Sequence, residues 1–280
     1  MSGILYLVAT PIGNLEDITY RAVRILSEAD LIAAEDTRNS IKLLNHFDIK
    51  KPMTSYHEFN RYDKAEVLIE KLEAGENIAL ITDAGTPGIS DPGEVLVSMC
   101  LDKGIQVVPV PGAVAGINAL IASGQKTSGF TFEGFIPQEK KERSRVLERI
   151  GSEERTMIIY EAPHRLVKTL GLLREILGDD RSITICKELT KKHESFVKTT
   201  LAEAVGLYET QEPRGEYVLV IAGKSREEVE SEERAAWDEI SIEDHLQKYI
   251  DEGMTKKEAI KQVALVRGLP KREVYNIVNK

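Results

Sequence analysis

The sequence predicts an α/β protein with two α/β domains followed by a small helical module at its C-terminus. The first observation is that three apolar segments, at 4–9, 78–81 and 105–110, each run into a turn rich in proline and glycine and then into a segment with helical spacing. Strands that alternate with helices in this way form a parallel sheet with helices on its faces. The second observation is that the alternation resumes after residue 130, and the third is a basic C-terminal segment with clear helix signals.

The turn after the strand at 78–81 is the most informative segment, and it reads TDAGTPGISDPG over 82–93. Glycine permits positive φ and close backbone approach, while proline stiffens the chain. A rigid loop at the carboxyl end of a strand is where open α/β sheets bind ligands. The loop has carboxylates and hydroxyls but no lysine or arginine, so it suits a polar, partly cationic small molecule better than a phosphate. The alternative is a tight connection that binds no ligand.

Two other turns of the first half carry candidate contacts. The strand at 4–9 ends in TPIGN, whose single glycine matches neither a GxGxxG nor a Walker A loop. The apolar strand at 31–34 is followed by EDTR at 35–38. Polar residues of both charges at a strand's carboxyl end are candidate substrate contacts. The alternative is that they only cap the helix expected at 40–46.

The second half predicts a further α/β domain, in which a mixed sheet is the favoured arrangement. Its expected strands are 130–136, 157–160, 183–186 and 217–222, with helices near 166–177 and 201–208. We expect the chain to divide into a first α/β domain at 1–122, a second at 123–224, an acidic linker at 225–240 and a basic three-helix module at 241–280.

The C-terminal segment reverses its charge along the chain. Residues 224–244 carry three basic and nine acidic residues, which is typical of a solvated linker or an exposed helix. Residues 254–280 carry seven basic and two acidic residues, and capping-box patterns begin at Ser241 and Thr255. These signals predict helices at about 242–251, 255–267 and 270–278, in an arrangement that looks like a helix-turn-helix module. The alternative is a packing or dimerisation tail.

Composition narrows the class of protein. The chain of 280 residues has no run of about 18 apolar residues, and its N-terminus lacks a basic region, so neither a transmembrane helix nor a signal peptide is expected. Cys100 and Cys186 are the only cysteines, and neither lies in a metal-ligand pattern. We therefore expect a cytoplasmic protein without a metal site. A net charge of −9 argues against a globally basic nucleic-acid binder.

Six motifs lie between residues 10 and 194: TPIGNLEDIT (10–19), AAEDTR (33–38), TDAGTPGISDPG (82–93), VPGAVAGINAL (110–120), YEAPHR (160–165) and KELTKKHE (187–194). Together they resemble the tetrapyrrole methylase superfamily and, within it, the ribosomal RNA small subunit methyltransferase I family. The resemblance implies a class III methyltransferase fold, S-adenosylmethionine as donor and, commonly, a homodimer. It also implies 2′-O-methylation of a cytidine in the decoding region of small-subunit (16S) rRNA.

Carried over by position, the resemblance places the cofactor between the two α/β domains. The implied cofactor-binding residues are Pro11 and Gly13 in the first turn, Asp83, Ala84, Gly85, Thr86, Pro87 and Ile89 in the main loop, Ala113 and Val114 in the third turn, and Tyr160 and Lys187 from the second domain. No metal is implied.

Residue type and loop position suggest the remaining roles. A 2′-hydroxyl attacks well only after it loses its proton, so a base is useful. The candidate bases are Glu35, Asp36 and Glu188, and the alternative is loss of the proton directly to solvent. The candidate RNA-binding residues are Arg38, Arg165 and Lys191, together with Lys271 and Arg272 at the start of the last helix.

The resemblance therefore implies an enzyme that methylates RNA ribose, with small-subunit rRNA or the 30S particle as partner, and the composition predicts no membrane association. One alternative is a tetrapyrrole or precorrin C-methyltransferase. Related enzymes of that kind carry a GDP triplet where this chain has Gly85-Thr86-Pro87, which disfavours it. The other alternative is a non-catalytic RNA-binding protein that retains the fold.

Overall fold

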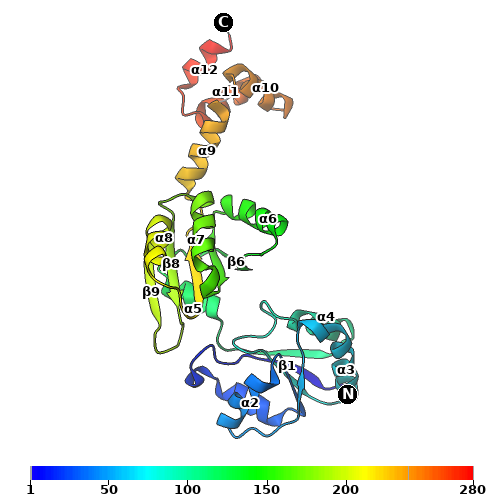
Figure 1. The fold of residues 1–280 in the computed structure, drawn as a ribbon. Coiled ribbons are helices and arrows are strands. Elements are labelled where there is room, and N and C mark those ends of the chain that lie inside the picture. Colours follow the sequence, from blue (N-terminus) through cyan, green and yellow to red (C-terminus); the bar gives the residue numbers. More distant parts are fainter. Residues whose placement is uncertain (1, 239, 280) are drawn as a thin grey trace. The chain divides into compact units, whose positions relative to one another are not determined.

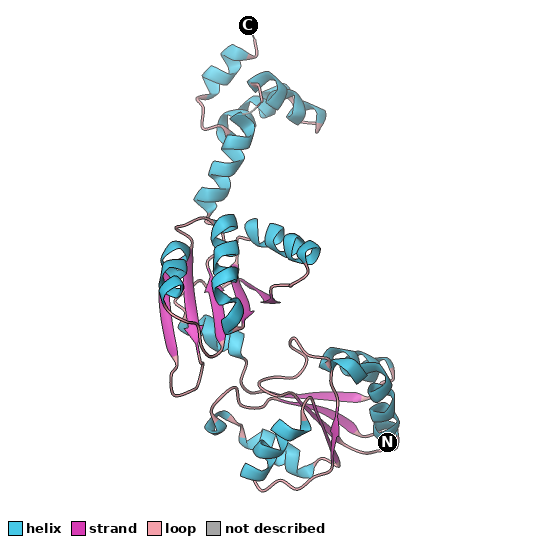
Figure 2. Ribbon diagram, in the orientation of Figure 1, coloured by secondary structure: helices cyan, strands magenta, loops and turns pink. Residues whose placement is uncertain are grey.

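The computed structural model describes residues 2–238 and 240–279, which divide into two compact units (Figures 1 and 2). The larger unit, the α/β body, comprises the residues up to 151 and residues 156–222. The smaller unit, the C-terminal unit, comprises residues 152–155 and the chain from residue 223 onward. In the described part of the chain, no helix is long and apolar enough to cross a membrane.

The first sheet of the α/β body is entirely parallel, as the alternation of apolar segments predicts. Its strands are β1 (Ile4–Val8), β2 (Leu31–Ala34), β3 (Met53–Ser55), β4 (Ile78–Ile81) and β5 (Gln106–Val110), in the order β3-β2-β4-β1-β5. Strand β4 is the middle strand, and β1 beside it pairs Leu5 with Ile78 of β4 and with Val107 of β5. All five strands therefore send their carboxyl ends, with the three Pro/Gly turns, to the same edge.

Helices cover both faces of this sheet. They are α1 (Tyr20–Glu28), α2 (Thr37–His46), α3 (Arg61–Glu73) and α4 (Gly93–Asp102), with short 3-10 turns at Leu15–Asp17 and Glu58–Asn60. Leu5 and Leu80 face α3 and α4 in one apolar cluster, whereas Val8 and Ile81 face α1 and α2 in another. Strands buried on both faces explain why β2 and β4 read as continuous apolar runs rather than as alternating patterns.

The second sheet is mixed. Its strands are β6 (Phe130–Phe135), β7 (Thr156–Glu161), β8 (Ser182–Lys187), β9 (Ser195–Thr200) and β10 (Tyr217–Ile221), in the order β6-β7-β10-β8-β9. Only the β6–β7 pair is parallel. Sequence analysis did not predict β9, because this edge strand pairs only with β8 and its two apolar residues, Phe196 and Val197, are exposed and form no strand pattern.

Helices α6 (Lys140–Gly151), α7 (Pro163–Leu177) and α8 (Leu201–Thr210) pack on one face of the second sheet. The opposite face is covered by α5 (Ala115–Ala122), which follows the last strand of the first sheet (Figure 1). Its Ala119 and Leu120 pack with Ile158 of β7 and Val220 of β10. Helix α5 thereby ties the first α/β segment to the second sheet.

The C-terminal unit contains α9 (Arg226–Asp238), α10 (Ile242–Asp251), α11 (Lys256–Val266) and α12 (Lys271–Ile277). The acidic segment at 225–240, expected as a linker or an exposed helix, thus contains a helix. Thr255 and Glu258 form the capping box expected at the start of α11, and Ser241 caps α10. The last three helices enclose a small core that includes Leu246, Val263 and Val274.

Candidate active site

A cleft of about 560 Å³ opens at the carboxyl edge of the first sheet and extends to the ends of β7 and β10. This volume is in the range of sites that hold small-molecule cofactors. The cleft is lined by Ile12, Ala84, Gly85, Thr86, Ile89, Val114, Ala115, Phe135, Tyr160, Glu161, Ala162, Pro163, His164, Leu189, Glu216, Tyr217 and Val218.

Six of the twelve residues expected to bind a cofactor line this cleft, namely Ala84, Gly85, Thr86, Ile89, Val114 and Tyr160. The other six, namely Pro11, Gly13, Asp83, Pro87, Ala113 and Lys187, lie in the same turns or strand ends but not in the lining itself. Lys187 ends β8, and its ammonium lies over the ring of Tyr217 at 6.0 Å from the centroid.

Hydrogen bonds between turns fix the first wall of the cleft. The amide of Thr10 donates to the carbonyl of Gly85 at 2.8 Å, and the amide of Gly85 donates back to Thr10 at 3.1 Å. The hydroxyl of Thr86 donates to the carbonyl of Ala113 at 3.0 Å. The three Pro/Gly turns are therefore hydrogen-bonded to one another, which keeps the backbone that faces the cleft in one conformation.

The two carboxylates of the main loop have structural partners. Asp83 accepts hydrogen bonds from the amide of Asp36 at 3.1 Å and from the side chain of Asn39 at 3.2 Å. Asp91 accepts from the amides of Gly88 and Gly93, at 2.8 Å at the closest. Both carboxylates thus shape the loops at the edge of the sheet, and neither lines the cleft.

Tyr160 forms part of the opposite wall. Its ring meets Phe132 and Phe135 edge to face, with centroids 5.0 and 5.8 Å away. Its hydroxyl accepts a hydrogen bond from the amide of Gly116, at the start of α5. Burial raises the pKa of the phenol, despite the opposing effect of this hydrogen bond, so the hydroxyl keeps its proton and can donate it to a neighbour.

Glu161, the next residue, is a buried carboxylate that sequence analysis did not single out. It accepts hydrogen bonds from the hydroxyl of Thr169 at 2.5 Å and from the amide of Ala162 at 2.9 Å. It also pairs with Arg165, whose Nε lies 3.3 Å from the carboxylate. Arg165 donates to the carbonyl of Ile136 as well, so this candidate RNA-binding arginine is largely committed to the protein.

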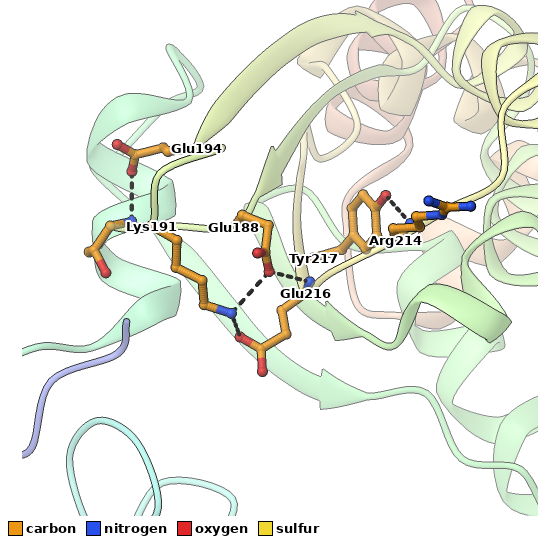
Figure 3. Close-up of polar contacts among 7 residues, drawn as sticks. Glu188, Lys191, Glu194, Arg214, Glu216 and Tyr217 are labelled. Atoms are coloured by element: carbon orange, nitrogen blue, oxygen red, sulfur yellow. Dashed lines mark hydrogen bonds and ion pairs between the residues drawn. The ribbon is translucent and has the colours of Figure 1, made fainter. Parts of the chain in front are cut away.

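Besides the Glu161–Arg165 pair, a cluster of charged residues lies where the β8–β9 loop meets β10, next to the part of the cleft lined by Leu189 and Glu216 (Figure 3). Lys191 places its ammonium 2.9 Å from the carboxylate of Glu188 and 2.7 Å from that of Glu216. Burial alone would raise the pKa of Glu188, but the hydrogen bonds from Lys191 and from the amide of Glu216 outweigh it and lower that pKa. Both Glu188 and Lys191 are therefore held charged and paired.

The loop that carries this cluster closely approaches the first turn. Glu188 and Thr190 have positive φ, at 52° and 65°, which is uncommon for residues other than glycine. A Cβ on Gly13 would lie 2.6 Å from Cγ of Lys191 and 2.9 Å from the hydroxyl of Thr190. A side chain at position 13 would therefore collide with this loop, which explains why glycine occupies the position.

The remaining candidate bases lie after β2. The side chain of Asp36 caps α2 and pairs with Arg38 at 2.7 Å, and this hydrogen bond lowers the pKa of Asp36 to about 2. Glu35 accepts a hydrogen bond from the hydroxyl of Thr82 at 2.6 Å. Within the described residues, Glu35 has no ion-pair partner, in contrast to Asp36 and Glu188.

The C-terminal unit has a groove of its own, with a volume of about 490 Å³. It is lined by Lys256, Lys257, Ile260, Lys271, Tyr275 and Asn279. Lys271 thus faces the groove, and Arg272 is its neighbour in the first turn of α12. Three lysines beside the half-exposed ring of Tyr275 combine phosphate-binding charge with a surface on which a base can stack.

The walls of the cleft suit an adenosyl sulfonium. Aliphatic and aromatic side chains provide apolar surface, and the hydrogen-bonded turns provide backbone donors and acceptors. No lysine or arginine lines the cleft. Two carboxylates also line the cleft, and each is paired with a basic residue outside the lining, Glu161 with Arg165 and Glu216 with Lys191. Within the described residues, no group of three His, Cys, Asp or Glu side chains is placed to hold a metal ion.

The chain matches a family model and resembles named relatives over nearly its whole length. A family model described as Tetrapyrrole (Corrin/Porphyrin) Methylases matches residues 4–205. Ribosomal RNA small subunit methyltransferase I of Synechocystis sp. is 50% identical over 275 residues, which cover 98% of this chain and 97% of that protein. The protein of the same name from Bacillus subtilis is 49% identical over 274 residues, which cover 98% of this chain and 93% of that protein.

Solved structures show the same fold at low sequence identity. Diphthine synthase aligns with a TM-score of 0.64 and 14% identity, over 80% of this chain and 91% of that one. Uroporphyrin-III C-methyltransferase from Thermus thermophilus, complexed with S-adenosylhomocysteine, aligns with a TM-score of 0.56 and 19% identity, over 79% of this chain and 97% of that one.

Proposed function

The chain belongs to the ribosomal RNA small subunit methyltransferase I family of the tetrapyrrole methylases. From this premise we propose that it uses S-adenosylmethionine to methylate the 2′-oxygen of a cytidine in the decoding region of small-subunit rRNA. The observation that carries the proposal is the cleft, which has apolar walls, rigid backbone at 84–86 and no basic side chain of lysine or arginine in its lining. Bound there, the donor supplies an electrophilic methyl group on a sulfonium.

The first task of the chain is positioning. Ala84, Gly85 and Thr86 belong to a loop that is hydrogen-bonded to both neighbouring turns, so their backbone groups hold the nucleoside without rearrangement. Tyr160 closes the other side with a protonated hydroxyl. Correct placement of two reactants can supply up to ~7–11 kcal/mol of barrier reduction in favourable cases. A rigid cleft is the part of this structure that delivers such an effect.

The second task is to take the proton of the 2′-hydroxyl. Asp36 and Glu188 are already paired with Arg38 and Lys191, which makes them poor proton acceptors. Glu35 is bound only by the neutral hydroxyl of Thr82 among the described residues. Of the three candidates, Glu35 is therefore the one that we propose as the base, from a position at the edge of the sheet next to the cleft lining rather than within it.

The third task is to hold RNA, and the C-terminal unit contributes to it. The groove beside Lys256, Lys257 and Lys271 gathers positive charge on a protein that is acidic overall. Arg272 extends this charge along α12. Phosphates bind the lysines and Arg272, and an unpaired base stacks on Tyr275.

The test is incubation of the chain with labelled S-adenosylmethionine and immature small subunits in the presence of EDTA, followed by separation of RNA from protein. The proposal expects label in the small-subunit rRNA. Label in a tetrapyrrole such as uroporphyrinogen instead of RNA would favour a C-methyltransferase. RNA binding without transfer of label would indicate a non-catalytic RNA-binding protein.

A further inference from the structure

A second cavity, of about 200 Å³, lies beside the first turn of α7. It is lined by Ile136, Pro137, Gln138, Arg143, His164, Arg165, Lys168, Thr169 and Leu172. His164 lines this cavity and the cofactor cleft alike. The two spaces therefore lie next to each other, with His164 in the wall of both.

The lining of this cavity is basic. Arg143, Arg165, Lys168 and His164 contribute to it, and no carboxylate does. The carboxylates that interact with these arginines have other partners. Glu161 is buried and saturated by Thr169, Arg165 and the amide of Ala162, while Glu139 accepts hydrogen bonds from the amides of Lys141 and Glu142 at the start of α6. Because Glu161 offsets the charge of Arg165, the positive charge of the cavity comes mainly from Arg143 and Lys168.

The two arginines are fixed in place by the protein. Arg165 is anchored by Glu161 and by the carbonyl of Ile136. Arg143 donates from one terminal nitrogen to the carbonyl of Gln138 at 2.6 Å, which leaves most of the five donors of its guanidinium available. Lys168 is exposed and has no side-chain partner among the described residues. The fixed charge of the two arginines binds an anion with little loss of side-chain freedom, whereas Lys168 loses freedom when it joins them.

We infer that this cavity, the phosphate pocket, binds a backbone phosphate of the substrate RNA next to the methylated nucleotide. The inference rests on the proposed function. A ribose whose 2′-oxygen reaches the cleft carries a phosphate within a few bonds of that oxygen, and the pocket is the basic space beside the cleft. Arginine and lysine together are the usual ligands of RNA phosphates. The pocket thereby sets the position of the ribose relative to the methyl donor.

The test compares the double variant Arg143→Gln, Lys168→Gln with the control Arg145→Gln. Arg145 is an exposed arginine two residues along α6, which places it on nearly the opposite side of that helix. Methylation kinetics are measured on immature small subunits, and binding to a single-stranded RNA oligonucleotide is measured over a salt series. Calorimetry with S-adenosylhomocysteine checks that the cleft is intact in each variant.

In the double variant, KM for the small subunits should be about tenfold higher, because a charge-assisted contact to the substrate is lost. Its kcat should change by less than about twofold. Its salt slope for RNA binding should be flatter by about 0.7, the value for one phosphate on a single strand. Affinity for S-adenosylhomocysteine should not change, and Arg145→Gln should behave as the wild type.

Two results would overturn the inference in distinguishable ways. If the wild type methylates small subunits and the double variant matches Arg145→Gln in KM and in salt slope, the pocket does not bind phosphate although the proposed function stands. If the wild type itself transfers no methyl group to rRNA, the proposed function fails and the inference fails with it. If the double variant loses donor binding, the same KM and salt-slope measurements on the single variant Lys168→Gln decide the question. The side chain of Lys168 is exposed, so its replacement should not disturb the fold.

Discussion

The amide nitrogen of Gly116 lies 2.8 Å from the hydroxyl oxygen of Tyr160 and donates a hydrogen bond to it. The first N–H groups of a helix have no partner within the helix, so Tyr160 satisfies one such donor of α5. A Cβ at position 116 would lie 3.2 Å from Cγ2 of Ile158 and 3.3 Å from the hydroxyl of Tyr160. Glycine therefore allows the start of α5 to approach β7 at the wall of the cleft.

Tyr160→Phe should weaken donor binding because it removes this acceptor and leaves the amide of Gly116 unpaired. A buried donor without a partner costs about 1–3 kcal/mol, which we expect to appear as a lower melting temperature. Because the start of α5 is then no longer held against the wall of the cleft, we also expect the Kd for S-adenosylhomocysteine to rise about tenfold. Calorimetry in EDTA measures the affinity. Tyr20→Phe is the control, since the side chain of Tyr20 is 98% exposed. Equal affinities for the two variants would show that the hydroxyl of Tyr160 plays no part in forming the site.

Glu35→Gln should lower kcat by roughly 10²–10⁴-fold, the usual contribution of a general base, while the Kd for S-adenosylhomocysteine stays the same. Asp36→Asn is the matched control in the neighbouring position, because asparagine still caps a helix N-terminus. Its kcat should change much less. If Asp36→Asn or Glu188→Gln abolishes turnover while Glu35→Gln does not, the base has been assigned to the wrong carboxylate.

Replacement of Lys271 and Arg272 with Ala should flatten the salt dependence of RNA binding by about one unit or slightly more, since each phosphate contact on a single strand contributes roughly 0.7. Tyr275→Ala should weaken binding by about 1–3 kcal/mol if a base stacks on its ring. Lys261→Ala is the control, because Lys261 is exposed on α11 and does not line the groove. A slope equal to that of the wild type would show that the C-terminal unit does not hold RNA.

The stability of the C-terminal unit should depend on pH through His245. This buried imidazole accepts a hydrogen bond from Arg267 at Nδ1 and stacks on Trp237 with centroids 3.7 Å apart. Burial, together with the charges of Arg267 and Lys248, lowers its pKa to about 4 from the usual 6.5. The unfolded chain therefore binds the proton more readily than the folded one, so stability is complete above pH 6.5 and falls as the pH drops toward 4.

Urea unfolding followed by fluorescence measures this effect directly, because Trp237 is the single tryptophan of the chain and stacks on His245. The unfolding midpoint should be constant above pH 6.5 and decline between 6.5 and 4. His193→Gln, a change at an exposed histidine, should keep that decline. A midpoint that stays level or rises on acidification would contradict the environment assigned to His245.

Much of the fold could be predicted from the sequence because burial leaves a pattern. The strands β2 and β4 are buried throughout and were visible as apolar runs, and the caps at Ser241 and Thr255 fixed two helix starts to within one residue. The edge strands β3 and β9 were missed because neither contains a run of buried apolar residues.

The site could be predicted only in part, since a sequence shows a charge but not its partner. Lys191 was expected to be available for phosphates, yet it is paired with Glu216, which lies 25 residues away along the chain. The buried carboxylate of Glu161 and the second cavity beside His164 depend on the packing of α7 against β7, which no local pattern reveals. By contrast, proline and glycine after an apolar strand are a local signal, and the turns that they predicted at 84–86 and at Val114 do line the cleft.

The identity of the methylated nucleoside tests the central claim most directly. Small subunits incubated with the chain and labelled S-adenosylmethionine can be deproteinised and hydrolysed in alkali, and the products resolved by mass spectrometry. We predict label in a dinucleotide that resists alkaline cleavage and yields 2′-O-methylcytidine, because a methyl group on the 2′-oxygen blocks attack on the neighbouring phosphate. Label on a base ring, in a product that alkali cleaves completely, would contradict the account.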